Sequence, residues 1–186
     1  MRALDKAEHV TPLRGQDMNE KLINEAKAGS KEAFAALYSE YKDRLYRYAL
    51  YRLGDPAEAE DAVSDCVLAA WKSIGSLRSS AAFGSWIFRI LSGCCNARIK
   101  EMIGSRDKVE AAGKELVSSP PAAPPSLGTE LAEALAILGS DEREIVLLSV
   151  VAGLSSAEIS EQTGLAPGTV RSKLSRSLAK MRGFLS

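Results

Sequence analysis

Four prolines stand within ten residues of this 186-residue chain, in the segment VSSPPAAPPS from Val117 to Ser126. Proline has no amide hydrogen and disfavours helical backbone at the residue before it, so no helix can run through this segment. Proline-rich segments act as semi-rigid spacers. We therefore predict a linker at residues 107–127 that joins a domain of residues 18–106 to a second domain of residues 128–186.

Both predicted domains carry the apolar spacing of amphipathic helices. Apolar residues recur every three or four positions at residues 34–49, 63–74, 83–102, 131–138 and 144–151. This spacing gathers them on one side of a helix. No stretch shows the alternation or the β-branched enrichment of a strand. We predict an all-α chain of two small helical domains, preceded at residues 1–17 by a flexible tail without sustained periodicity.

The charges cancel overall but are grouped along the chain. Lys and Arg number 24, as do Asp and Glu, so the formal net charge is zero. Residues 54–65 nevertheless hold five acids and no base, and residues 72–100 hold five bases and no acid. The same order returns at residues 130–164, which are acidic except for one arginine, and at residues 165–186, which are purely basic. A single block is common on a solvated helix face, whereas two acid-then-base pairs favour charged partners.

The composition excludes several classes of protein. No run approaches the roughly 20 apolar residues of a membrane helix, and the first ten residues lack the apolar core of a secretory signal. We therefore expect a cytoplasmic protein without membrane insertion. Three cysteines without CxxC spacing and a single histidine fit neither a disulfide framework nor a zinc site. We expect no cofactor and no metal, and the adjacent Cys94 and Cys95 are interpreted as small buried thiols rather than oxidant sensors.

Residues 155–181 have the pattern of a helix-turn-helix. The sequence from Ser155 to Glu158 has the Ser-x-x-Glu form of a capping box, Gly164 suits a tight turn, and Pro167 suits the first position of the next helix. The apolar side of that second helix is predicted to contain Val170, Leu174, Leu178 and Met181. Its opposite side then presents Arg171, Ser172, Ser175 and Arg176, with Lys173 at the edge. Such a helix can enter the major groove of duplex DNA.

Several stretches resemble a known family. The sequences GLSSAEIS at residues 153–160 and GTVRSKLSR at residues 168–176 resemble region 4 of the extracytoplasmic-function (ECF) group of bacterial RNA polymerase sigma factors, in the sigma-70 family. AEDAVSDCVLAAW at residues 59–71 looks like region 2.2 of that family, and AFGSWIFRI at residues 82–90 looks like the segment entering region 2.4. The resemblance covers about residues 19–185. It implies an initiation factor that is not an enzyme and that brings core polymerase to promoters.

The resemblance also implies partners. Family members bind core RNA polymerase at the clamp helices of β′ and at the β flap, and they open promoter DNA. We expect polymerase contacts from Glu60, Asp61 and Asp65, whose charge suits a basic surface. Asp55 and Glu58 are interpreted instead as stabilising the start of a helix after Pro56. An anti-sigma factor that covers the same surfaces is expected as a further partner.

The DNA-binding residues implied by the resemblance fall into two sets. For the minus-thirty-five element they are Thr169, Arg171, Ser172, Lys173, Ser175 and Arg176. For the minus-ten element, the loop at about residues 75–85 is expected to hold an extruded base, with candidates Leu77, Arg78, Ser79 and Ser80. Trp86 either stacks on a base or belongs to the core, and the core is the commoner place for an aromatic at helical spacing. Phosphates are expected to bind Arg89, Arg98 and Lys100.

The chain departs from the family at one place, and two other functions stay open. After Ile90 the family commonly continues with Ala-Arg-Asn and a later Asp, whereas this chain has Leu-Ser-Gly and Ala97, so contacts by that arginine and asparagine are not carried over. A conventional helix-turn-helix regulator would bind duplex DNA without polymerase, usually as a dimer. A helical adaptor that binds only protein would tolerate the loss of Arg171 and Arg176.

Overall fold

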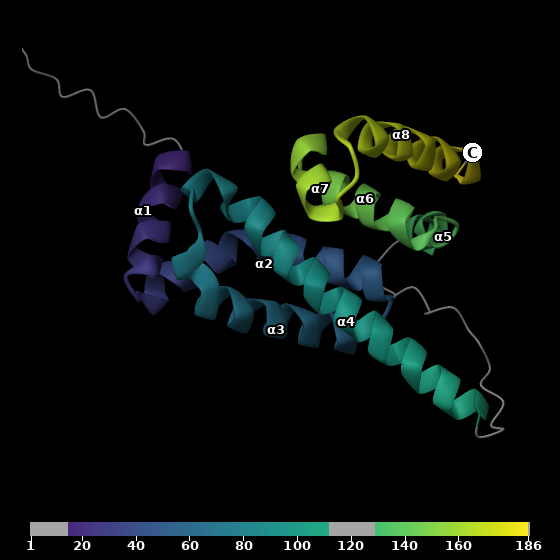
Figure 1. Ribbon diagram of the computed structural model, residues 1–186, viewed down its shortest axis with the longest axis horizontal. Helices are drawn as coiled ribbons and strands as arrows, with labels where there is room; N and C mark the ends of the chain where they lie inside the picture. Colours follow the sequence, from purple (N-terminus) through teal and green to yellow (C-terminus); the bar gives the residue numbers. More distant parts are fainter. Residues whose placement is uncertain (1–14, 112–128, 186) are drawn as a thin grey trace, which may run out of the picture.

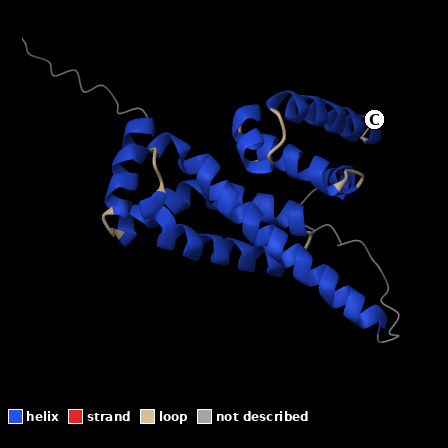
Figure 2. Ribbon diagram, in the orientation of Figure 1, coloured by secondary structure: helices blue, strands red, loops and turns tan. Residues whose placement is uncertain are grey.

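The computed structural model describes residues 15–111 and 129–185, and every element in these two ranges is helical (Figure 2). The predicted all-α class is confirmed. Helix α1 begins at Gly15, inside the predicted tail, and α4 extends to Ala111, inside the predicted linker. The proline cluster and residues 1–14 lie outside the described residues. None of the helices in the described ranges combines the length and the apolar character needed to cross a membrane.

The N-terminal unit consists of four α-helices and two short 3-10 helices (Figure 1). They are α1 (Gly15–Lys27), α2 (Lys31–Leu53), α3 (Pro56–Ser73), η1 (Ile74–Ser76), η2 (Ser80–Ala82) and α4 (Phe83–Ala111). Helices α2, α3 and α4 pack against one another. Their core is filled by side chains that are fully buried, among them Leu37, Leu45, Tyr48, Phe88 and Leu91.

Local signals explain where these helices start and stop. The Ser30 hydroxyl accepts the Ala33 amide at 3.2 Å and caps α2, which ends at Gly54 with φ of 74°. Only glycine adopts that left-handed backbone without strain. Asp55 then accepts the Glu58 amide at 2.9 Å and caps α3, with Pro56 in the first turn. The interpretation of Asp55 as a helix-starting residue is confirmed.

The C-terminal unit consists of α5 (Thr129–Ala136), α6 (Ser140–Val150), α7 (Ser156–Thr163) and α8 (Pro167–Phe184). The predicted capping box is confirmed, because Ser155 accepts the Glu158 amide at 3.3 Å and Glu158 accepts the Ser155 amide at 2.9 Å. Gly164 closes α7 with φ of 73°, and Pro167 is the first residue of α8. The predicted helix-turn-helix is therefore present, with Ile145, Leu148, Ile159 and Val170 at its core.

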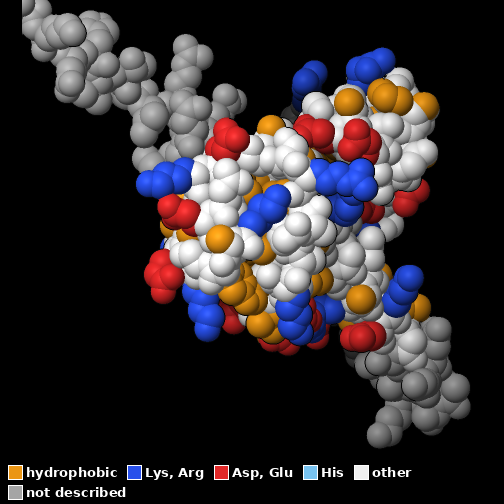
Figure 3. All heavy atoms as spheres, turned by 60° about the vertical axis from the view of Figure 1, so that its left-hand side comes forward, with side chains coloured by type: hydrophobic (Ala, Val, Ile, Leu, Met, Phe, Trp, Pro, Cys, Tyr) orange, Lys and Arg blue, Asp and Glu red, His pale blue; other side chains and the backbone are white. Residues whose placement is uncertain are grey.

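The two units lie side by side, with α6 against α2 (Figure 1). Arg52 of α2 reaches Ser140 and Glu144 of α6. Arg44 of the same helix donates to the carbonyls of Val151 and Ala152, just after α6. In Figure 3, Lys and Arg side chains lie beside Asp and Glu side chains on both units, so this face carries charges of both signs.

Candidate nucleic-acid and polymerase interfaces

Helix α8 presents a polar face to solvent. Val170 and Met181 are buried, and Leu174 and Leu178 are partly buried against the same core. Arg171, Ser172, Ser175 and Arg176 are all exposed on the other side. The predicted division of this helix into a buried and an exposed side is confirmed. Thr169 is exposed as well, and its carbonyl accepts the Ser172 hydroxyl at 3.0 Å.

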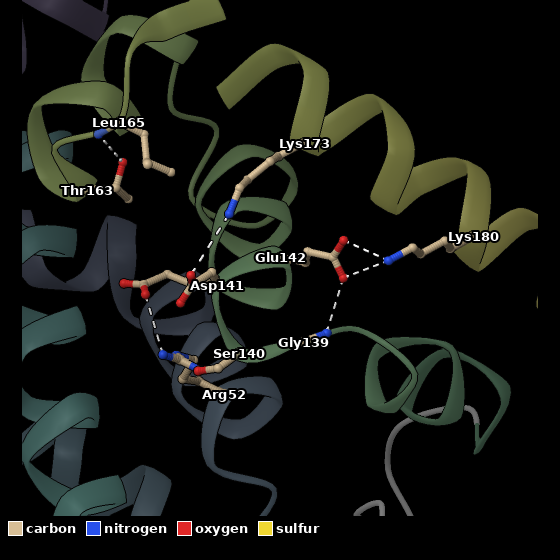
Figure 4. Close-up of polar contacts among 10 residues, drawn as sticks. Arg52, Gly139, Ser140, Asp141, Glu142, Thr163, Leu165, Lys173 and Lys180 are labelled. Carbon is tan, nitrogen blue, oxygen red and sulfur yellow. Dashed lines mark hydrogen bonds and ion pairs between the residues drawn. The ribbon is translucent and has the colours of Figure 1, made fainter. Parts of the chain in front are cut away.

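The polar side chains of α8 differ in whether they make hydrogen bonds or ion pairs within the chain. Arg176 Nε donates to the carbonyl of Ser172 at 3.2 Å, so its guanidinium lies along its own helix. Lys173 lies 3.9 Å from Asp141 and is only partly exposed, which turns it toward the start of α6 (Figure 4). Arg171 makes no ion pair in the described part of the chain. A free guanidinium beside two hydroxyls is suited to base edges and phosphates in a major groove.

Two residues of α6 make ion pairs with lysines of α8. Glu142 accepts Lys180 Nζ at 2.7 and 3.0 Å and also the Gly139 amide at 3.2 Å (Figure 4). The hydrogen bond from Lys180 is the main reason that the pKa of Glu142 is lowered. Asp141 lies 3.9 Å from Lys173. The start of α6 thus contacts two lysines of α8, and no sequence motif indicated these contacts.

The loop between α3 and α4 exposes three of its four predicted residues. Arg78 and Ser79 are exposed, and Ser80 is partly exposed at the start of η2. Leu77 is different, because only 4% of it is exposed and its carbonyl accepts Lys27 Nζ at 2.7 Å. Its side chain is a core residue that anchors the loop, and the prediction that Leu77 contacts a base is not retained.

A cavity of about 380 Å³ lies beside this loop. It is lined by Asn19, Glu20, Ile23, Tyr41, Ser80, Ala81, Phe83 and Gly84. The rings of Tyr41 and Phe83 meet edge to face at 5.2 Å. Trp86 is partly buried with its ring 5.8 Å from that of Phe83, and it does not line this cavity. Sequence reasoning missed Asn19 and Tyr41, because they come from α1 and α2 and only the fold brings them to the loop.

Arg98 lies in a cluster with the acids of α3. Its guanidinium contacts Glu58 and Asp65 at 2.8 Å each and Asp61 at 3.4 Å. These three acids face α4 because they lie three and four positions apart on one side of α3. The hydrogen bonds to Glu58 and then to Asp65 raise the pKa of Arg98 above its ordinary value. We call these four residues the Arg98 cluster.

The Arg98 cluster corrects one prediction. Arg98 was predicted to hold phosphate, but its side chain is 18% exposed and is bound to three carboxylates. Glu58 lies in the first turn of α3, as its interpretation as a helix-starting acid requires, and its carboxylate also contacts Arg98. Asp61 and Asp65 remain more than half exposed while paired, and Glu60 is exposed next to them. Lys100 is exposed, and Arg89 lies 3.9 Å from Glu161 of α7.

The cysteines behave as packing residues. Cys66 and Cys95 are fully buried, and Cys94 is partly buried. Burial raises the pKa of Cys95 to about 12, and it raises the pKa of Cys66 and Cys94 as well. A thiol with a raised pKa holds little of the reactive thiolate. The interpretation of Cys95 as a small buried thiol is confirmed, whereas Cys94 is only half covered.

Comparison with known proteins finds the same regions in the same order. Residues 37–101 match the family Sigma-70 region 2, and residues 129–181 match the family Sigma-70, region 4. The chain is 32% identical over 169 residues to the ECF RNA polymerase sigma factor SigL of Mycobacterium tuberculosis, which covers 86% of this chain and 93% of SigL. It is 31% identical over 166 residues to the ECF RNA polymerase sigma factor SigM of the same organism, covering 86% and 82% of the two chains.

Solved structures show the same fold. The protein CnrH, solved in complex with the cytosolic domain of CnrY, superposes with a TM-score of 0.67 at 22% identity, covering 91% of this chain and 97% of CnrH. The sigma factor RpoE of Bartonella quintana, solved with the anti-sigma factor NepR, gives 0.67 at 24% identity, covering 82% and 96%. With regions 2 and 4 matched in order and relatives above 30% identity over most of their length, this chain belongs to the ECF group of RNA polymerase sigma factors.

Proposed function

We propose that this chain brings RNA polymerase to promoters by binding core enzyme and the minus-thirty-five and minus-ten elements, and that it promotes melting of the minus-ten DNA. The observation that carries the minus-thirty-five assignment is the exposed side of α8. Arg171, Ser172, Ser175 and Arg176 stand together opposite a buried stripe, on the second helix of a helix-turn-helix. Arginine can bind guanine edges through two hydrogen bonds, and serines can bind phosphates or bases. Thr169 and Lys173 flank this set.

The minus-ten element is assigned to the loop between α3 and α4. Arg78 and Ser79 are exposed there, and Ser80 lines the cavity of about 380 Å³ beside them. A base taken out of the stack needs a pocket with an aromatic wall and a few polar groups. Tyr41 and Phe83 supply aromatic rings, and Asn19 and Ser80 supply polar groups. Arg89 and Lys100, farther along α4, are assigned to phosphates, and Trp86 is assigned to the packing around Phe83.

The polymerase contact is assigned to the exposed edge of α3. Glu60, Asp61 and Asp65 give this edge its negative charge, and a basic partner surface such as the β′ clamp helices would complement it. Arg98 holds Asp61 and Asp65 in place while leaving more than half of each side chain exposed. The β flap is a second expected contact on polymerase. An anti-sigma factor is the expected inhibitor, in keeping with the RpoE–NepR complex, whose sigma factor shares this fold.

Under this proposal the chain needs no catalytic residue of its own, because polymerase carries out the nucleotide chemistry. Its single histidine, His9, lies outside the described residues. The chain would act in the cytoplasm, where polymerase and promoters are found.

The decisive experiment is run-off transcription with purified bacterial core polymerase on a promoter library. We compare the intact chain with the double variant Arg171→Ala plus Arg176→Ala. Loss of two such contacts, at about 1–3 kcal/mol each, is expected to lower promoter-specific transcript at least tenfold. Circular dichroism should show unchanged helix content, because both side chains are exposed.

The matched control is Lys31→Ala plus Lys42→Ala, which removes two exposed positive charges from α2. Transcription should be unaffected, since neither lysine belongs to the assigned surfaces. Equal output from intact chain and double variant would remove the assigned role of α8. Specific duplex binding that needs no core enzyme would favour a conventional regulator, and full activity without either arginine would favour a protein-binding adaptor.

A further inference from the structure

The guanidinium of Arg98 takes one oxygen from each of three carboxylates of α3. Nη1 donates to Glu58 Oε2 at 2.8 Å and to Asp61 Oδ2 at 3.4 Å, and Nη2 donates to Asp65 Oδ2 at 2.8 Å. Within the described ranges, Oδ1 of Asp61 and Oδ1 of Asp65 make no hydrogen bond. Both oxygens of an ionised carboxylate accept hydrogen bonds. Each aspartate therefore keeps one oxygen for a partner while it is bound to Arg98.

The cation of the Arg98 cluster is covered, whereas the two aspartates face solvent. The side chain of Arg98 is 18% exposed, and those of Asp61 and Asp65 are 68% and 57% exposed. Three carboxylates outnumber the one guanidinium, and Glu60 adds a further exposed acid beside them. The edge of α3 thus stays negative toward an approaching partner, and its carboxylates are more accessible to that partner than Arg98 is.

Arg98 orders the two aspartates with respect to the core of the N-terminal unit. Asp61 and Asp65 are four positions apart on α3, so their like charges would repel each other without a cation between them. Arg98 comes from α4, which packs on α3 through buried residues such as Ile87, whose carbonyl accepts Cys66 Sγ at 3.7 Å. Side chains that are held before a partner arrives lose less conformational freedom on binding, and this raises affinity.

Two effects of Arg98 on a basic partner oppose each other. Its positive charge weakens the long-range attraction of the α3 edge, but salt largely screens charges that are more than about 8 Å apart at an ionic strength near 0.15 M. The ordering of the carboxylates acts in the contact itself and is not screened in this way. Ordering one side chain in advance raises affinity by about two- to tenfold, and Arg98 orders two. We therefore expect a net gain in affinity from Arg98 at this ionic strength.

We propose that Arg98 is a positioning residue for polymerase binding, which holds Asp61 and Asp65 so that their second oxygens accept hydrogen bonds from basic side chains of core enzyme. This inference rests on the proposed function, because that function assigns the two aspartates to polymerase. It gives α4 a second task beside DNA binding. Arg98 then acts on the affinity for polymerase through α3 and touches neither polymerase nor phosphate itself.

The test measures the affinity of the full chain for immobilised bacterial core polymerase by biolayer interferometry, without DNA, so that no phosphate contact contributes. Arg98→Ala is expected to raise the Kd at least about threefold, both near 0.15 M and near 0.4 M salt, where long-range attraction is weaker. Arg98→Lys keeps the charge without the planar fork and should recover only part of the affinity. If Arg98→Ala loses helix content by circular dichroism, Arg98→Lys carries the comparison.

Two control variants separate the positioning role from simpler effects. Lys42→Ala removes an exposed cation from α2, outside the assigned surfaces. Ile87→Val removes one buried carbon from α4, which lowers the stability of the same helices and leaves every charge of the Arg98 cluster in place. Both variants should bind core polymerase as the intact chain does.

A double-mutant cycle tests whether Arg98 acts through the aspartates. The pair Asp61→Asn plus Asp65→Asn should itself weaken binding, because these acids are the assigned contacts. In that background Arg98→Ala should change the Kd by less than about twofold, because Arg98 has no assigned contact left to position.

Three outcomes are decisive against the inference. Unchanged or tighter binding by Arg98→Ala would show that ordering the carboxylates adds nothing to affinity. An equal loss with and without the two aspartates would show that Arg98 acts independently of them. In both cases the proposed function stands if the aspartate pair still weakens binding. If Asp61→Asn plus Asp65→Asn binds as the intact chain does, the polymerase contact assigned to this edge is wrong, and the role of Arg98 is lost with it.

Discussion

Arg98 joins two surfaces that the sequence treats as separate. It comes from the basic block and its three partners come from the acidic block, and the antiparallel packing of α3 and α4 brings them together. Blocks of like charge can be identified from the order of residues along the chain. Which charged side chains form ion pairs depends instead on which helix faces pack together. The sequence therefore identified the charged residues and not their pairing. Leu77 shows the same limit, since a loop position predicted to be exposed is buried by the neighbouring helices.

Replacing Arg98 by alanine is expected to destabilise the N-terminal unit. Three carboxylates of α3 would face one another without a counter-charge, and partly exposed pairs contribute up to about 1 kcal/mol each. We expect the free energy of unfolding to fall by about 1–2 kcal/mol, measured by urea denaturation with tryptophan fluorescence, which reports Trp71 and Trp86 of this unit.

Arg98→Lys is the informative companion of that variant. It keeps the charge but cannot hold two carboxylates with one planar fork, so it should restore only part of the lost stability. If Arg98 instead served mainly as a phosphate ligand, the alanine variant would keep its stability and lose only affinity for DNA. An Arg98→Ala variant with unchanged stability would therefore support the assignment of Arg98 to the minus-ten DNA contact.

Among the elements, α6 makes contacts with α8 and α2 that its sequence did not indicate. Its start holds α8 through Glu142 and Asp141, and both of its ends bind α2. The sequence did predict helices here and in the helix-turn-helix, because capping box, glycine and proline are signals that act within a few residues. It did not predict what α6 contacts, because those partners lie up to 108 residues away along the chain.

The Glu142 contact makes the C-terminal unit sensitive to acid. The hydrogen bond from Lys180 lowers the pKa of Glu142, so its stabilising effect is present above the ordinary pKa of a glutamate and is lost as the pH falls through the lowered value. The intact chain should therefore have a higher thermal midpoint than Glu142→Gln at neutral pH, by circular dichroism, and the difference should shrink toward zero in strong acid. Glu130→Gln, at an exposed site, serves as the control. A difference that persists unchanged in acid would mean that the ion pair is not the cause.

At the scale of the whole molecule, the sequence predicted two helical domains and their chemistry but not their arrangement. The proline cluster indicated a boundary, and motifs indicated which helix faces DNA. The docking of α6 on α2 depends on single side chains, among them Arg44, Arg52 and Gln162, that belong to no motif and whose partners are backbone carbonyls as often as side chains. Such contacts leave no periodic signal. The cavity beside the α3–α4 loop escaped prediction for the same reason, since three segments build it.

The arrangement makes a thermodynamic prediction about Arg44, which lies over the rings of Tyr41 and Phe88 and binds the chain after α6. Arg44→Ala should lower the free energy of unfolding of the C-terminal unit by about 1 kcal/mol, because two carbonyls lose a charged donor, and small domains are only marginally stable.

All tryptophans and tyrosines of the chain lie in the N-terminal unit, at positions 38 to 86, so fluorescence follows that unit while circular dichroism follows both. In urea, the circular dichroism transition of the variant should therefore begin earlier than in the intact chain and shift further than its fluorescence transition, which reflects only the loss of the contacts of Arg44 with Tyr41 and Phe88. Arg47→Ala, one turn along α2 and also exposed, should leave both transitions unchanged. If fluorescence and circular dichroism of Arg44→Ala shifted together, the two units would unfold as one body, and the docked C-terminal unit would be part of the stability of the N-terminal unit rather than a separable partner.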